Sequence, residues 1–158
     1  MNMLYAIIIG IILIICVVIL VSLEKTKPSS DWKSFTRNRL KEIDAHTDFD
    51  NYMSLKAAII DLDSLLDHAL KNSRLSGQTM GERLKSAHSM FERSLYDEIW
   101  TAHKMRNQLV HEPSFKPALG RLSQSRKALK EAIMKTMWTF LGKPLKKTPS
   151  IWYHPTHD

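Results

Sequence analysis

The stretch from Leu55 to Ala69 reads LKAAIIDLDSLLDHA and decides the fold class of this chain. Its large apolar side chains recur at alternating steps of four and three residues, which gives the narrow apolar stripe of a helix packed in a bundle. That stripe consists of Leu55, Ile59, Leu62, Leu66 and Ala69. Five glycines, six prolines and no internal repeat argue against a β-sandwich with many turns. The sequence therefore predicts an all-α domain.

Helix-boundary signals on both sides of this stretch predict the rest of a four- or five-helix bundle. Thr79-Met80-Gly81-Glu82 matches a capping box and should begin a short helix. Ser94 is expected to cap the next helix, which should run to about His111 because Pro113 disfavours helical geometry at the residue before it. The remaining helices are expected over residues 31–46 and from 117–125 to 141.

The N-terminal region predicts a membrane anchor. Residues 3–21 are apolar and carry no charge, and a helix of about 20 such residues crosses a bilayer. No Lys or Arg precedes them, so the charged start of a secretory signal peptide is missing. The basic residues that follow favour a single-pass protein in the cell membrane, with its N-terminus outside and its C-terminal domain in the cytoplasm. These residues are Lys25, Lys27, Lys33, Arg37 and Arg39.

The expected organisation has four parts. Residues 3–23 form the transmembrane anchor, 24–30 a linker, 31–141 the helical domain, and 142–158 a flexible tail with basic and aromatic residues. The only cysteine, Cys16, lies in the apolar stretch, so the domain cannot form a disulfide of its own or use a thiol in catalysis. This fits a reducing compartment.

The run Arg106-Asn107-Gln108-Leu109-Val110-His111 is the strongest chemical signal. A guanidinium can hold phosphate oxygens in a bidentate manner, and an imidazole can transfer protons near neutral pH. The two together can act on a phosphodiester without a metal. The structural alternative is that Arg106 and His111 only interact with the C-terminal end of the helix dipole, worth about 0.3 to 1 kcal/mol each.

A helical bundle that carries Arg-Asn-x-Leu-Val-His near the end of its penultimate long helix resembles the HEPN superfamily. The matching positions are Arg106, Asn107 and His111. The resemblance implies a HEPN-like bundle and metal-independent cleavage of RNA, with two copies of the motif completing a cleft in a homodimer. Arg106 would hold the scissile phosphate, His111 would exchange the proton, and Asn107 would orient one of them. An ideal helix places Arg106 about 140° around from His111, so a frayed end or a second subunit would have to join them.

The charge of the chain is concentrated near its C-terminal end. Residues 113–147 contain nine basic residues and one acidic residue, within a chain of net charge +7. Together with Lys104, the basic residues Arg126 and Lys130 are candidates for binding RNA or phosphate. Anionic lipid headgroups would attract the same residues, and the sequence leaves both alternatives open.

No cofactor is expected, and no metal site is predicted. Asp61, Asp63 and Asp67 are acidic enough for a metal, but the first two point about 200° apart on a helix, so we expect a solvated face. His103 is expected to be a satisfied histidine rather than a second proton carrier. No zinc-binding spacing, phosphate-binding glycine loop or G-x-S-x-G motif is present.

Two classes of function follow. The first is a membrane-anchored HEPN-like module that binds RNA or nucleotides and acts as an endoribonuclease through Arg106 and His111. The second is a non-catalytic helical adaptor or dimerisation module at the cytoplasmic membrane surface. The expected partners are the membrane, RNA, a second copy of the chain, and a protein partner or antitoxin.

Overall fold

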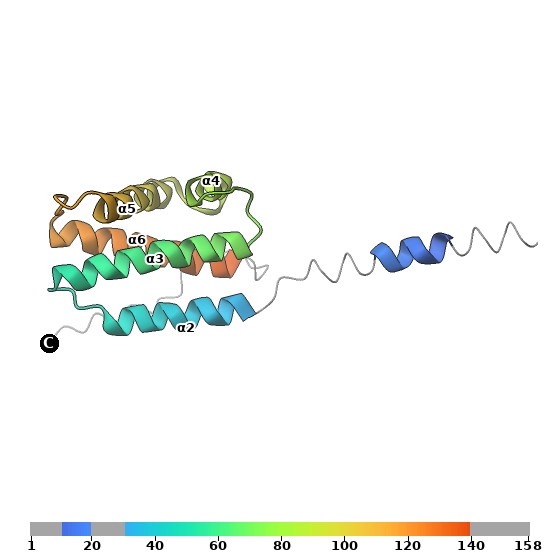
Figure 1. The fold of residues 1–158 in the computed structure, drawn as a ribbon, viewed down its shortest axis with the longest axis horizontal. Helices are drawn as coiled ribbons and strands as arrows, with labels where there is room; N and C mark the ends of the chain where they lie inside the picture. The colour runs from blue at the N-terminus through green and yellow to red at the C-terminus, as the bar shows by residue number, and fades with distance from the viewer. Residues whose placement is uncertain (1–10, 20–30, 140–158) are drawn as a thin grey trace, which may run out of the picture. The chain divides into compact units, whose positions relative to one another are not determined.

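The computed structural model describes residues 11–19 and 31–139. The chain divides into two units, Met1–Ser30 and Asp31–Asp158. Every regular element of the described residues is helical, so the predicted all-α class is confirmed. The described residues of the second unit form five α-helices and one short 3-10 helix (Figure 1). They are α2 (Asp31–His46), α3 (Tyr52–Asn72), α4 (Met80–Ser86), η1 (His88–Met90), α5 (Arg93–His111) and α6 (Leu119–Thr139).

Helix α3 is the centre of the bundle and packs against α2, α5 and α6. The predicted stripe is confirmed, because Leu55, Ile59, Leu62 and Leu66 have no exposed surface. A buried leucine or isoleucine contributes about 1.5 to 3 kcal/mol to folding, so this one helix supplies much of the apolar driving force. The core side chains of α5 and α6, among them Ile99 and Leu129, complete the same core.

The connection from α3 to α4 is fixed by one arginine. Arg83 donates from Nε and Nη2 to the carboxylate of Asp67 at 2.7 and 2.9 Å, and from Nη1 to the carbonyl of Gly77 at 2.8 Å. Only 7% of Arg83 is exposed, and the hydrogen bond to Asp67 raises its pKa. The predicted start of α4 is confirmed, because the hydroxyl of Thr79 accepts from the N–H of Glu82. The carboxylate of Glu82 in turn accepts from Gln78, one residue before the cap.

Helix α5 begins two residues earlier than expected. Its N-cap is Glu92, whose side chain makes no capping hydrogen bond, so the prediction that Ser94 caps this helix is wrong. The end of α5 at His111 agrees with the stop signal from Pro113.

The predicted membrane anchor is corrected. In the N-terminal unit the structure describes residues 11–19, which are helical. Across residues 11–19 and 31–139, no helix combines the length and the hydropathy that a bilayer crossing requires. A transmembrane helix over residues 3–23 and a single-pass location in the cell membrane are therefore not supported. Residues 3–10 and 20–23, the linker at 24–30, the last two residues of the predicted helical domain (140–141) and the tail at 142–158 lie outside the described residues.

Candidate functional site

The side chain of Arg106 is directed towards α3. Its Nε lies 3.6 Å from Oδ2 of Asp63, and its Nη1 donates to Oδ1 of the neighbouring Asn107 at 3.1 Å. Arg106 is partly buried, with 29% of its side chain exposed. The structure thus brings together two of the three predicted catalytic residues, Arg106 and Asn107, but gives the guanidinium a carboxylate partner within the chain.

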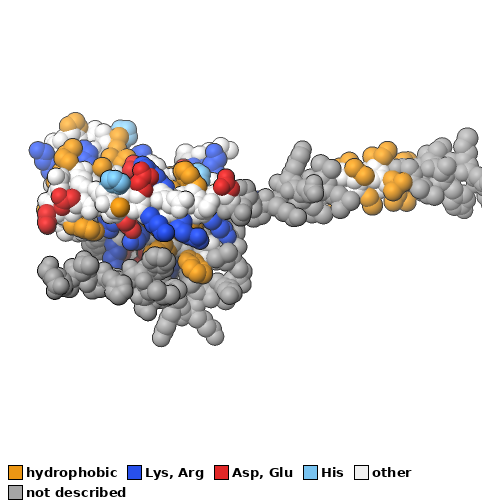
Figure 2. All heavy atoms as spheres, turned by 90° about the horizontal axis from the view of Figure 1, so that it is seen from below, with side chains coloured by type: hydrophobic (Ala, Val, Ile, Leu, Met, Phe, Trp, Pro, Cys, Tyr) orange, Lys and Arg blue, Asp and Glu red, His pale blue; other side chains and the backbone are white. Residues whose placement is uncertain are grey.

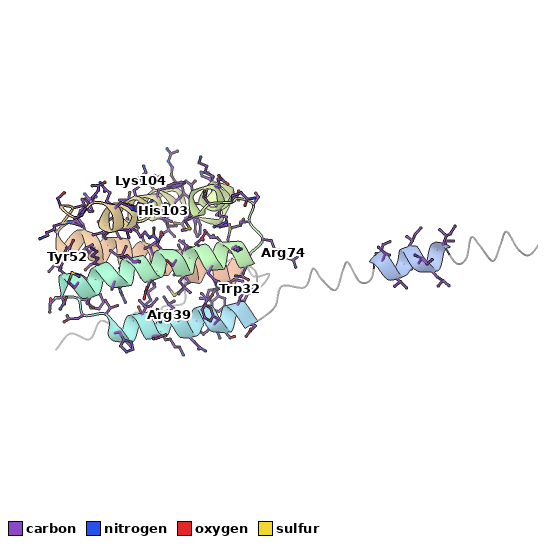
Figure 3. All side chains as sticks on the ribbon, in the orientation of Figure 1. Trp32, Arg39, Tyr52, Arg74, His103 and Lys104 are labelled. Carbon is purple, nitrogen blue, oxygen red and sulfur yellow. The ribbon has the colours of Figure 1, made fainter. Side chains whose placement is uncertain are left out.

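Asp63 is the centre of this cluster. The residue is 4% exposed, and its Oδ1 lies 2.9 Å from Nδ1 of His103 on α5. Because an ionised carboxylate can only accept, the imidazole donates this bond from Nδ1. Figure 3 shows His103 on α5, and the bond to Asp63 places its ring on the side that faces α3. His103 is the satisfied histidine that was expected.

The expectation of a solvated aspartate face on α3 is wrong for Asp63, which is buried, whereas the side chains of Asp61 and Asp67 are 46% and 32% exposed. Asp61 accepts a hydrogen bond from Arg39 of α2 at 3.0 Å, Asp67 accepts from Arg83, and Asp63 is buried against α5. Each carboxylate flanks the apolar stripe of α3 and so meets a cation from a neighbouring helix. These ion pairs depend on basic residues of other helices. They could be predicted from the sequence only if it were known which helices pack against α3.

His111 does not join this cluster. It is the last residue of α5, it is exposed, and its side chain forms no hydrogen bond with Arg106 or with any other residue in the described part of the chain. Arg106 interacts with Asp63 and Asn107, so within one chain the predicted pair is not assembled.

The three predicted phosphate-binding residues lie on two different sides of the bundle. Lys104 is exposed on α5 (Figure 3). It lines a hollow between α5 and the start of α6, together with Gln108, Phe115 and Arg121. Arg126 and Lys130 lie on α6, where both form ion pairs with Asp44 of α2. These residues therefore do not form one basic surface.

Arg126 and Lys130 mainly fasten α6 to α2. Arg126 is 7% exposed, forms a short contact with Oδ1 of Asp44 and lies 4.7 Å from the ring centre of Phe49. Burial lowers the pKa of its guanidinium, and the charge of Asp44 opposes that shift. Lys130 Nζ lies 2.6 Å from Oδ2 of the same carboxylate. Both charges are largely neutralised inside the chain.

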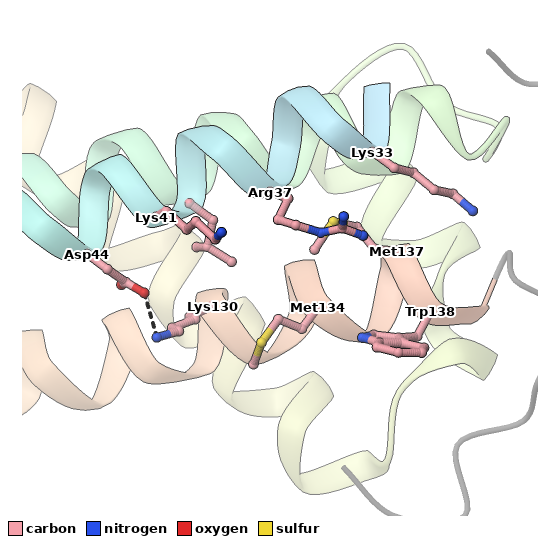
Figure 4. A pocket seen from close by; sticks show the side chains of 9 residues that line it. Lys33, Arg37, Lys41, Asp44, Lys130, Met134, Met137 and Trp138 are labelled. Carbon is pink, nitrogen blue, oxygen red and sulfur yellow. Dashed lines mark ion pairs between the residues drawn. The ribbon is translucent and has the colours of Figure 1, made fainter. Parts of the chain in front are cut away.

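A groove lies between α2 and α6 beside this ion pair (Figure 4). Its apolar lining comes from Leu40 of α2 and from three residues of α6, which are Met134, Met137 and Trp138. The cations along its α2 side are Lys33, Arg37 and Lys41. Figure 2 views the molecule from the α2 side and shows Lys and Arg side chains gathered on this face, next to apolar side chains.

The three cations on the α2 side of the groove have no acidic partner in the described part of the chain. Within the described residues, Lys33, Arg37 and Lys41 form no ion pair, although Lys33 Nζ lies 5.6 Å from the ring centre of Trp32. Asp44, the acidic residue of the groove lining, is already bound to Arg126 and Lys130. The groove therefore combines an apolar floor with uncompensated positive charge. The spacing of four residues between these cations is the sequence signal that could have indicated this face of α2.

Within the described residues, no group of three His, Cys, Asp or Glu side chains could hold a metal ion. No protein-family model matches the chain, and no curated protein or solved structure is similar enough to be matched to it. The function is therefore inferred from the geometry alone.

Proposed function

We propose that this protein is a non-catalytic helical binding module that holds an anionic partner with an apolar face in the groove between α2 and α6. The observation that carries the proposal is the row of Lys33, Arg37 and Lys41, which form no ion pair with any residue that the structure describes. They lie beside the apolar side chains of Leu40, Met134, Met137 and Trp138. Neither the cations nor the apolar side chains would be unusual by themselves, because single exposed lysines and single exposed apolar residues are common on protein surfaces.

The combination is what favours binding. Three like charges along one helix face repel one another, and among residues 11–19 and 31–139 no acidic residue forms an ion pair with them. An anion in the groove would remove that repulsion, and an apolar group beside it would gain about 25 cal/mol for each Å² of apolar surface buried. The two methionines add adaptability, because the unbranched thioether side chain fits ligands of different shape.

A non-catalytic function is further supported by the state of the predicted catalytic residues. Arg106 has Asp63 as its counter-charge, and His111 is exposed at the helix end without contact to Arg106. His103 is held by Asp63 and lies against the ring of Trp100, with the ring centres 6.0 Å apart. The RNA-cleaving homodimer that the HEPN resemblance implies stays a prediction, and this geometry gives it little support.

The proposal is tested by NMR of the full chain with labelled methionine methyl groups. The probe is dodecyl phosphate below its micelle concentration, which has an anionic head and an apolar chain. We expect shifts at the methyl groups of Met134 and Met137, and little effect from an uncharged dodecyl glycoside. Arg37→Glu should weaken the effect of the phosphate probe by about tenfold, because it replaces an attraction with a repulsion.

Arg93→Glu is the matched control. Arg93 is exposed at the first turn of α5, away from the lining of the groove, and a glutamate there suits the helix dipole. This variant should bind the probe as the original chain does. Equal weakening by both variants, or methyl groups that do not respond to the probe, would contradict the proposal.

The catalytic alternative has its own test. The full chain is incubated with RNA in excess chelator, beside Arg106→Ala and His111→Ala variants. The proposal predicts no RNA cleavage above background for any of the three proteins. Cleavage that both substitutions abolish would restore the ribonuclease hypothesis.

A further inference from the structure

Resting on the proposed function, we infer that the natural occupant of the groove is an acidic amphipathic helix of a partner protein. Three features of the groove support this occupant. They are the spacing of its cations, its apolar floor and the hydrogen bonds within the two helices that form its walls. Each of these restricts the shape and the chemistry of the ligand.

The spacing of the cations determines the spacing of the acidic residues that the ligand needs. Lys33, Arg37 and Lys41 are separated by four residues each on α2, so they follow one ridge of the helix at steps of about 6 Å along its axis. A second helix lying along this ridge repeats with the same step. Glutamates or aspartates at every fourth position of that helix would therefore each meet one cation of α2.

The apolar floor of the groove requires an apolar face on the ligand. Leu40, Met134, Met137 and Trp138 form the apolar part of the lining, and the three residues of α6 occupy one to two turns. An amphipathic helix offers apolar residues at spacings of three and four, which would cover this strip while its acidic ridge faces α2. The ligand would then lie between two helices of the bundle as an additional bundle helix.

The walls exclude an extended peptide. Both walls are α-helices, whose central N–H and C=O groups are already bonded within each helix. An extended segment on the apolar floor would leave its own backbone groups without partners, at a cost of about 1 to 3 kcal/mol for each buried group. A helix bonds its own backbone and avoids this cost.

Charge also argues against two occupants from the protein itself. The segment that follows α6 contains Lys143, Lys146 and Lys147, and a second copy of the chain has a net charge of +7. Both would bring positive charge to a positive groove. Single-stranded RNA would gain from the cations, but the lining offers one aromatic side chain, Trp138, rather than the series of aromatic platforms on which successive bases stack.

The experiment uses a synthetic peptide about four turns long with leucines along one face and glutamates at every fourth position. Its affinity for the full chain is measured by fluorescence polarisation, and its position by the methyl signals of Met134 and Met137. A second peptide has glutamine in place of each glutamate, and a third has a central proline that breaks the helix. An oligouridylate RNA and vesicles of phosphatidylglycerol are titrated in parallel.

We expect the acidic helical peptide to bind and to shift both methyl signals. The glutamine peptide and the Arg37→Glu protein should each show at least about tenfold weaker binding, the proline peptide should lose binding, and the Arg93→Glu protein should be unaffected. Equal binding of the acidic and glutamine peptides, or of the helical and proline peptides, overturns the inference. Stronger groove binding by the RNA or the vesicles overturns it as well.

The outcome separates this inference from the proposed function. If dodecyl phosphate reaches Met134 and Met137 but the acidic peptide does not, the groove is a binding site and the helical partner is wrong. If neither probe reaches these methyl groups, both fail.

Discussion

Asp63 of α3 accepts a hydrogen bond from His103 of α5 at 2.9 Å while its other carboxylate oxygen lies 3.6 Å from Nε of Arg106. One buried carboxylate thereby joins α3 to two side chains of α5. The Nε of Arg106 is buried without a hydrogen-bond partner of its own, so the ion pair with Asp63 is its main compensation for burial.

The first prediction concerns this carboxylate. Asp63→Ala should lower the free energy of unfolding by about 2 to 3 kcal/mol, because it leaves a partly buried guanidinium without a counter-charge. Urea denaturation followed by circular dichroism measures the loss. Asp97→Ala, at an exposed position of α5, is the control and should change stability by less than about 0.5 kcal/mol. A loss from Asp63→Ala no larger than that of the control would show that the cluster does not hold α3 to α5.

The second prediction concerns two glycines. Gly77 has a φ of +141°, and a Cβ there would lie 2.6 Å from the backbone N of Arg83. Gly77→Ala should therefore destabilise the protein by about 1 to 3 kcal/mol. Gly120 in α6 has open space around the position of a Cβ, so Gly120→Ala should stabilise by about 0.5 to 1 kcal/mol. Thermal unfolding of both variants checks the opposite signs, and a stabilising Gly77→Ala would contradict the described turn.

The third prediction is a pH dependence at the start of α4. Glu82 accepts the N–H of Gln78 at 2.6 Å, and this bond lowers the pKa of the carboxyl below its ordinary value of 4.5. A depressed pKa in the folded state means that the stabilisation is present above the unfolded pKa and is lost as the pH falls through the folded value. Glu82→Gln should therefore be less stable than the original chain near neutral pH, with the difference disappearing in acid.

The effect of Glu82 should be small, because its side chain is exposed. Unfolding curves of both proteins from neutral to acidic pH give the measurement, and Glu112→Gln, an exposed glutamate after α5, is the control. A difference for Glu82→Gln that grows as the pH falls would contradict the described cap.

Local patterns of the sequence predicted the helices but not the site. The stripe from Leu55 to Ala69 and the cap at Thr79 depend on neighbours in the chain, so α3 and α4 could be placed from spacing alone. The partners of Asp63 and Asp44 come from residues 40 and more positions away, and their burial depends on how the helices pair. For that reason Asp63 was taken as solvated, and Arg126 and Lys130 were taken as available for phosphate.

The partner of Arg106 in the arginine–histidine motif also could not be predicted from neighbouring residues in the sequence. Arg106 and His111 are close in sequence, but the α-helix turns them to different sides, and Asp63 of another helix is the partner of Arg106. The groove between α2 and α6 was missed because its cations and its floor belong to the two ends of the domain sequence.

The most direct test of the central claim is the binding of dodecyl phosphate to the full chain, followed at the methyl groups of all eight methionines. The account predicts that Met134 and Met137 shift at the lowest probe concentration, and that Arg37→Glu suppresses these shifts while Arg93→Glu does not. Shifts that appear first at methionines outside the groove, or that are the same in both variants, would contradict it.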